Sequence, residues 1–281
     1  MSFVRTLPLT LLLAASAVAQ EKHLLRFKFV PDTVVHYSMS QEMDMSMNMG
    51  AQDMSTKMNM QMFMTTKVKG VKDDAADLEQ EITRVKAVMN NPMMNVNFDS
   101  DDEDSDPGML EGMADMVGTK TTMRLSSAGK MLDFAMSEEL AEEAEQAGMD
   151  LKQMMSQSVT SLPEQPVAIG ETWTNTMKMP MGQMGELDMQ IENKLVAVDD
   201  KHIVVDQVIK VDTTEVEMPG GMALESVEAK GTSKIDRRIG MPAELTMNMR
   251  MKMSGQMTMT MDMKQTIRPA AAPAKKADDG K

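Results

Sequence analysis

Methionine is the residue type in this chain with the least ordinary chemistry. The sequence holds 39 methionines and no cysteine among 281 residues, and the methionines gather in two stretches, ten in residues 39–64 and eight in residues 247–263. A thioether is a flexible apolar group, a soft ligand that selects Cu(I), and a group that oxidises to the sulfoxide. The two stretches therefore offer apolar contact, soft-metal ligation or sacrificial oxidation.

The spacing of these methionines predicts β-strands. In both stretches methionine recurs at alternate positions, and the residues between them are almost all polar. Because successive side chains of a strand point to opposite faces, the pattern predicts four long strands with a thioether face and a solvated face. Hairpin loops are expected at residues 50–53 and 254–256, where glycine interrupts the alternation.

The first 19 residues have the features of a cleaved secretory signal. Arg5 forms a basic start, residues 7–15 are apolar, and small residues at 17–19 suit a signal peptidase. We therefore expect an extracytoplasmic protein, periplasmic or secreted, with no integral membrane segment after cleavage. The net charge of −14 disfavours nucleic acid as a partner.

The remaining sequence predicts a single β-rich domain over residues 20–268 and a disordered tail over 269–281. We expect about ten strands, the first near residues 24–29, with a turn around Gly70. Helices are expected at 109–116, 137–148 and 150–159. Helices of ~16 Å are too short to cover strands of ~50 Å, so the antiparallel sheet must curl into a half-barrel or barrel, with two or three helices on its concave side.

Few other residues form a pattern that suggests a reaction. The sequence has no nucleophile elbow, zinc-protease helix, P-loop or dinucleotide fingerprint, and its three histidines are scattered. We therefore predict no enzyme, no catalytic residue and no cofactor. Trp173, the only tryptophan, is predicted to anchor the core, and residues 236–238 (Asp-Arg-Arg) to form surface ion pairs.

An acidic run over residues 99–106 holds six carboxylates in eight positions. Such a run repels itself, and we expect a mobile, solvated loop. Calcium binding is the alternative, but an EF-hand needs glycine at its sixth position and glutamate at its twelfth. Counting from Asp99, those positions hold Asp104 and Leu110, so the motif fails.

Two phrases carry a family resemblance: Leu25-Arg26-Phe27-Lys28-Phe29 with Tyr37, Met39 and Gln41, and Leu162-Pro163-Glu164-Gln165-Pro166-Val167 leading to Gly170-Glu171-Thr172-Trp173. With them, most of the chain resembles an uncharacterised family of exported, methionine-rich bacterial proteins, a domain of unknown function. The order of elements is similar to the half-barrel carriers of lipoproteins and lipids in the bacterial envelope. The resemblance implies a fold and a compartment, and no site residues.

The methionine faces leave several functions open. We predict a non-enzymatic protein that binds or carries an apolar ligand, either a small molecule such as a lipid or a lipidated protein, on a pliable surface. The alternatives are a periplasmic Cu(I)-binding protein that uses thioethers, and a structural or interaction protein with a filled methionine core. No metal ligand is assigned. The predicted ligand-binding residues are Met43, Met45, Met47, Met58, Met60, Met62, Met249, Met251, Met259 and Met261.

Overall fold

The computed structural model describes residues 21–48, 53–92, 95–102, 104–106, 108, 114–137, 161–180, 186–213, 217–218, 222–255 and 257–273. The predicted signal at 1–19, the helix predicted at 150–159 and most of the predicted tail lie outside the described residues, as do residues 138–148 of the helix predicted at 137–148. So do residues 109–113 of the other predicted helix, and residues 115–118 form turns.

Strands dominate the described chain. They are β1 (Lys22–His23), β2 (Val34–Asn48), β3 (Asp53–Lys72), β4 (Ala75–Asn90), β5 (Asn95–Asp99), β6 (Lys120–Ser126), β7 (Met131–Ala135), β8 (Val167–Ala168), β9 (Thr172–Pro180), β10 (Glu186–Val198), β11 (His202–Asp212), β12 (Glu217–Met218), β13 (Met222–Asp236), β14 (Met241–Ser254) and β15 (Thr258–Pro269). The described residues include no helix as long as these strands, and none long and apolar enough to cross a membrane.

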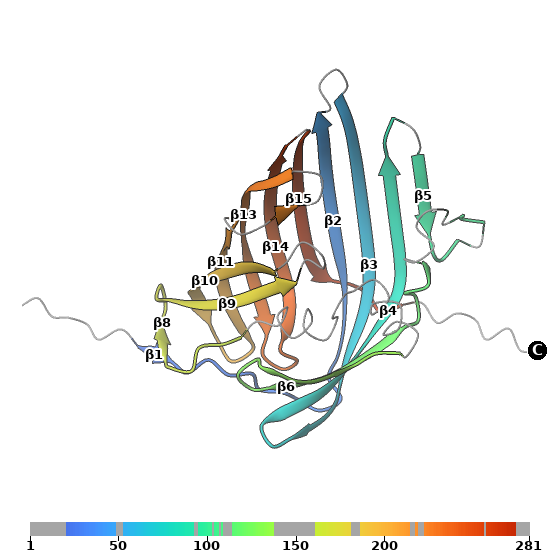
Figure 1. Ribbon diagram of the computed structural model, residues 1–281. Coiled ribbons are helices and arrows are strands. Elements are labelled where there is room, and N and C mark those ends of the chain that lie inside the picture. The colour runs from blue at the N-terminus through green and yellow to red at the C-terminus, as the bar shows by residue number, and fades with distance from the viewer. Residues whose placement is uncertain are drawn as a thin grey trace, which may run out of the picture.

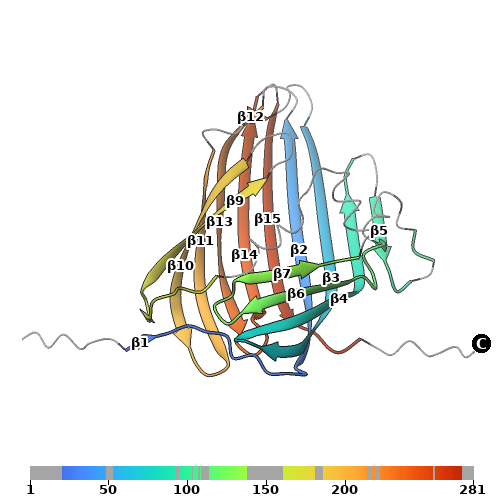
Figure 2. The same cartoon turned by 60° about the horizontal axis from the view of Figure 1, so that its bottom comes forward.

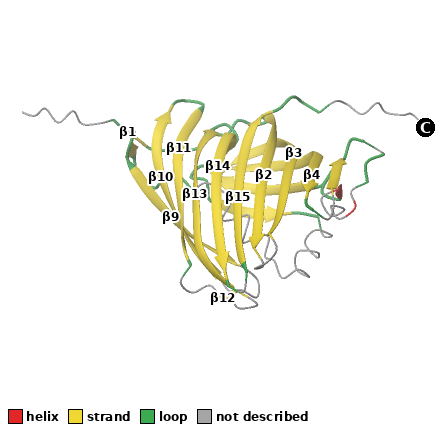
Figure 3. Ribbon diagram, turned by 90° about the horizontal axis from the view of Figure 1, so that it is seen from above, coloured by secondary structure: helices red, strands yellow, loops and turns green. Residues whose placement is uncertain are grey.

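Thirteen of the described strands form one curled antiparallel sheet (Figures 1 and 3). Its order is β7-β6-β4-β3-β2-β15-β14-β13-β11-β10-β9, with β5 beside β4 and β12 beside β13. The mainly β, antiparallel prediction is confirmed. The barrel alternative is wrong, because the edge strands β7 and β9 do not pair. The described residues form fifteen strands instead of about ten, and three of them, β1, β8 and β12, have only two residues.

The centre of this sheet comes from the two ends of the described chain. β15 pairs with β2 over twelve residue pairs, from Thr258 opposite Asn48 to Pro269 opposite Tyr37. This pairing brings the two methionine hairpins together as the adjacent strands β3-β2-β15-β14 (Figure 1).

Residues 24–30, which we call the strap, run across one end of the concave side (Figure 2). The prediction of a strand at 24–29 is wrong, because this segment joins no sheet: the backbone of Phe27 donates to Ser127, that of Lys28 to Arg237 and that of Val30 to Arg238. The strap therefore ties the β6–β7 turn to the β13–β14 turn.

One part of the buried core lies under the strap. Leu25 and Phe27 pack with Leu195, Val205 and other residues that point inward from β10, β11 and β13. A neighbouring cluster joins β3, β4, β6 and β7 around fully buried side chains such as Val68 and Leu125. Apolar burial at this end stabilises the curl. Two further buried clusters include methionines, one around Met62 and Met64 and one around Met253.

The predicted turn at Gly70 is wrong. Gly70 lies inside β3 at a register shift opposite Asp77, and the chain reverses at Asp73 and Asp74, which have φ angles of 53° and 60°. Aspartate tolerates this left-handed conformation better than most residues, so the reversal does not need a glycine.

Candidate functional site

The register of the central strands arranges the methionines in rows across the concave face. Met251 lies opposite Met261, which lies opposite Met45. Directly opposite residues of an antiparallel pair have Cβ atoms only ~4.5–5.5 Å apart, so the side chains of one row are neighbours. The other rows are Met253, Met259, Met47 and Met54, and Met249, Met263, Met43, Met58 and Met89.

All ten predicted binding methionines therefore lie on one face of four adjacent strands. We call the inward-pointing methionines of β3, β2, β15 and β14 the methionine face. Met62 and Met253, at 7% and 4% exposed, are buried, whereas the other nine predicted residues are half-buried. This intermediate burial distinguishes the methionine face from the fully buried core beneath the strap.

The opposite face of the same strands is charged. Arg250 bonds Asp262 across the β14–β15 pair at 2.6 and 3.1 Å, and Lys252 reaches Glu225 at 2.6 Å. Lys57 lies 3.6 Å from Asp44 on the β2–β3 pair. Opposite charges across neighbouring strands favour this register, and they keep the outer face solvated.

A row of side-chain amides crosses the concave face, and we call it the amide row. It consists of Asn193, Gln207, Gln265 and Gln41, with Gly231 and Met247 between Gln207 and Gln265 in the register. Gln207 Nε2 donates to Asn193 Oδ1 at 2.9 Å. Gln41 Nε2 lies 2.8 Å from Met263 Sδ, and Gln265 Nε2 lies 2.9 Å from Met39 Sδ.

Two buried donors next to the amide row have no hydrogen-bond partner among the described residues. They are Trp173 Nε1 and Ser233 Oγ. Trp173 lies opposite Asn193 on β9, and Ser233, 1% exposed, is two residues from Gly231 on β13. Native proteins rarely leave such groups unpaired, because an unmade hydrogen bond in the interior costs about 1–3 kcal/mol.

Charge is missing from the inward positions of the sheet. On β11, for example, these positions hold Ile203, Val205, Gln207, Ile209 and Val211. The described inward residues of the nine strands from β9 through β4 in the sheet order are likewise uncharged. In a chain with 26% charged residues, this separation leaves the described part of the concave face uncharged.

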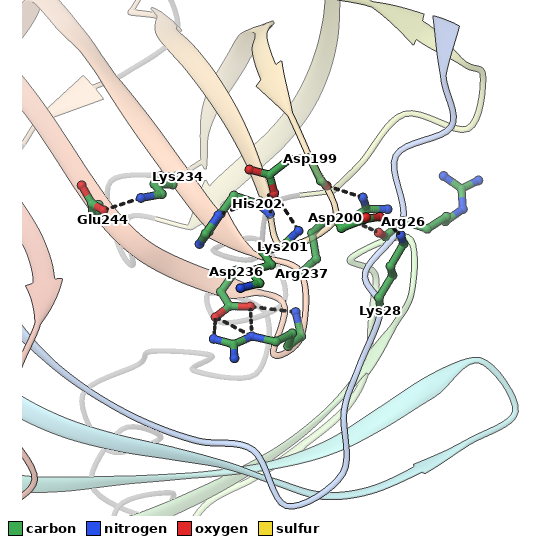
Figure 4. Close-up of polar contacts among 11 residues, drawn as sticks. Arg26, Lys28, Asp199, Asp200, Lys201, His202, Lys234, Asp236, Arg237 and Glu244 are labelled. Atoms are coloured by element: carbon green, nitrogen blue, oxygen red, sulfur yellow. Dashed lines mark hydrogen bonds and ion pairs between the residues drawn. The ribbon is translucent and has the colours of Figure 1, made fainter.

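Charged groups gather instead beneath the core, where they anchor the strap (Figure 4). Arg237 Nε donates to the Arg26 carbonyl at 3.0 Å, and Nη1 donates to the Asp199 carbonyl at 2.6 Å. The prediction of surface pairing is wrong for Asp236 and Arg237, which are only 4% and 7% exposed. They are buried because the strap, distant in sequence, is laid over them.

The carboxylate of Asp236 is held in its charged form. Arg238 donates to it through Nε at 3.0 Å, through Nη2 at 2.5 Å and through its backbone N–H at 2.9 Å. Burial raises the pKa of Asp236, but these hydrogen bonds outweigh it and leave the pKa below its usual value. Burial lowers the pKa of the Arg237 guanidinium, and Asp200 and Asp199 oppose that change.

The other candidate motifs lie away from the methionine face. The acidic run is more structured than expected: Asp99 accepts from Arg84 at 2.9 and 2.7 Å, and its backbone N–H donates to Ser105 Oγ. The hydrogen bonds from Arg84 lower the pKa of Asp99 strongly. The described residues contain no group of three or more His, Asp or Glu side chains arranged to hold a metal ion. Trp173 packs against the core, as predicted.

The fold and this face define an open, curled antiparallel sheet whose described concave side is uncharged and rich in methionine. Residues 148–267 match the model of a family of unknown function, DUF6263. The predicted resemblance to an uncharacterised family agrees with this match in part, since the match covers less of the chain than expected and carries no information on methionine content or export. None of the curated proteins matches the chain.

Among solved structures, the chain is similar to lipovitellin, in a structure concerned with lipid–protein interactions. The TM-score is 0.52 at 11% identity, and the match covers 89% of this chain and 26% of that one. The chain thus spans about a quarter of the lipovitellin chain, and the likeness concerns the fold alone.

Two further matches have TM-scores of only 0.23. DynF of the dynemicin pathway of Micromonospora chersina is 6% identical, over 91% of this chain and 88% of that one. The translocator domain of the autotransporter NalP from Neisseria meningitidis is 7% identical, over 86% and 90%. Neither bears on the site.

Proposed function

We propose that this chain is an exported, non-enzymatic protein that binds or carries an apolar ligand on the methionine face. The observation that carries the proposal is the combination of half-buried thioethers and an uncharged concave face on an open sheet. Flexible methionine side chains suit ligands of varied shape, because they repack without one fixed arrangement. The fold likeness to lipovitellin is compatible with this role.

Burial of the face supplies the driving force. Apolar surface removed from water contributes roughly 25 cal/mol per Å², so a ligand that covers several half-buried methionines gains several kcal/mol before the costs of binding. A charged side chain introduced at the centre of the face must then remain next to the ligand without a partner. That substitution is expected to abolish binding.

The test uses the full chain, purified without detergent, with native mass spectrometry and organic extraction of bound molecules. The wild-type protein should carry apolar molecules. Met45→Glu should carry none, while Ser46→Glu, which adds the same charge to the neighbouring exposed position on the other face, should match wild type. Wild-type protein that is consistently empty, with a dry and filled interior, would refute the proposal.

Cu(I) binding is a second candidate, because the register places thioethers on adjacent strands in every row. Three or four such sulfurs could surround one soft ion. Titration with Cu(I) against a competing chelator should then give a defined stoichiometry that Met45→Leu and Met261→Leu reduce. Binding of micromolar strength or weaker would exclude this candidate.

A further inference from the structure

We infer that the ligand of the methionine face is an uncharged amphiphile of the acylglycerol type, whose ester and hydroxyl groups hydrogen-bond to the amide row. The inference rests on the proposed function and names the chemical class of its ligand. In this arrangement the acyl chain lies along the methionine face and the glycerol end reaches toward the core.

Unused hydrogen-bonding capacity in the amide row supports this orientation. Gln41 Nε2 and Gln265 Nε2 lie against the thioether sulfurs of Met263 and Met39, which are weak acceptors. No described residue donates to the side-chain carbonyls of Gln41, Gln207 or Gln265. An ester carbonyl accepts from the glutamine N–H groups and a hydroxyl donates to the glutamine carbonyls, so one acylglycerol uses both kinds of group.

The neutrality of the face selects against charged lipids. A carboxylate or phosphate buried at the amide row would meet no cation, because the inward positions of the surrounding strands carry none among the described residues. An ion buried without a counter-charge loses several kcal/mol of solvation, whereas an ester loses far less. The same acyl chain should therefore bind much more tightly as an ester than as a free acid.

Trp173 provides the measurement, since it is the only tryptophan in the chain and lies opposite Asn193 of the amide row. Delipidated full-length protein is titrated at pH 8 with monooleoylglycerol, oleate and oleoyl-lysophosphatidylglycerol, each below its aggregation limit. Tryptophan emission reports binding. We expect monooleoylglycerol to shift the emission and to bind at least about tenfold more tightly than the two anionic lipids, because only those must lose the solvation of a charge.

Variants separate recognition from stability. Gln207→Leu with Gln265→Leu should reduce the ratio of ester to acid affinity about two- to tenfold, the range expected for losing a hydrogen bond. Gln190→Leu changes an exposed residue on the other face of β10 and should leave the ratio unchanged. Thermal unfolding of each variant identifies any that do not fold, and in that case Gln41→Leu, on a different strand, replaces it in the titration.

The outcomes distinguish the two proposals. If none of the three lipids binds, the proposed apolar-ligand function fails. If all three bind with equal affinity, or if the ratio is the same in Gln207→Leu with Gln265→Leu as in wild type, the carrier function stands and the acylglycerol inference is overturned.

Discussion

β13 and β14 approach each other closely at Gly231, so adding one methyl group there should destabilise the sheet. A Cβ built on Gly231 would lie 2.2 Å from the Thr246 carbonyl oxygen, 2.9 Å from Met247 Cα and 3.1 Å from Met247 Sδ. The sulfur can move, but the carbonyl and Cα belong to the paired strand. The two strands must therefore separate by about 1 Å to reach an ordinary van der Waals contact.

The size of the effect follows from these contacts. Overpacking lowers the free energy of unfolding by about 1–3 kcal/mol. A clash with backbone atoms, which no change of side-chain rotamer relieves, lies at the upper end of this range. Replacing glycine by alanine also stabilises by about 0.4–1 kcal/mol, because the unfolded chain loses freedom. We expect Gly231→Ala to lower the free energy of unfolding by about 2 kcal/mol, and therefore to lower Tm by about 4–8 °C in a chain of this size.

Gly70→Ala is the matched control. A Cβ at Gly70 would have no atom within 4 Å, and the residue has no left-handed φ angle, so this variant should be neutral or slightly more stable than wild type. Thermal and urea unfolding, followed by circular dichroism, measure both variants. Equal stability of Gly231→Ala and Gly70→Ala would refute the claim that the strand contact at Gly231 is tight.

Two other predictions concern the strap and the buried Asp236 carboxylate. Phe27→Ala removes a strap ring that is 4% exposed and should lower the free energy of unfolding by about 3–5 kcal/mol. Val30→Ala, the control, changes a side chain that is 45% exposed and should cost under about 0.5 kcal/mol. Equal losses of the two variants in urea unfolding would mean that the strap contributes little burial. Asp236→Asn should cost about 1.5–3 kcal/mol at pH 7, because it removes the charge that accepts from Arg238. Since the folded pKa of Asp236 is lowered, its contribution is complete above the unfolded value of ~3.9 and is lost as pH falls through the folded pKa. The stability difference between wild type and variant, measured from pH 7 to pH 2, should therefore shrink below about pH 4, and a constant difference would contradict this assignment.

The sequence predicts the strands of this protein well, because alternation of apolar and polar residues is local information. Met43, Met45 and Met47 point to one face because they share parity, and this follows without knowledge of neighbouring strands. The order of strands is not local. Nothing in residues 34–48 indicates that their second partner is residues 258–269, and so the four-strand methionine face could not be predicted from the alternation alone.

The amide row was missed, although the sequence contains a signal for it. Gln41 interrupts the apolar positions of one methionine hairpin, and Gln265 interrupts those of the other. Each stands two residues from a methionine of the same row, Met43 and Met263. A glutamine at an apolar position in both hairpins indicates that the two glutamines lie in one row across the sheet. Only the strand register shows that this row continues to Gln207 and Asn193.

The burial of Asp236 and Arg237 was predicted wrongly for a related reason. Three consecutive charged residues in a turn are usually exposed. Here the Arg26 carbonyl, 211 positions earlier, accepts from Arg237, and the strap that carries it covers the turn. Long-range contacts of this kind leave no trace in the local pattern.

The pairing of β2 with β15 also constrains how the chain can fold. The contact between Met39 and Gln265 joins residues 226 positions apart, so the middle of the sheet closes a loop of most of the described chain. Contacts of such high sequence separation slow folding, whereas the β2–β3 and β14–β15 hairpins are local and can form early. During synthesis the β2–β3 hairpin therefore has one unpaired edge, and its thioethers are in water, until residues 258–269 have been made. An edge in that condition invites pairing with other chains. The charged outer positions Glu42 and Asp44 on β2 give this waiting edge some protection from aggregation.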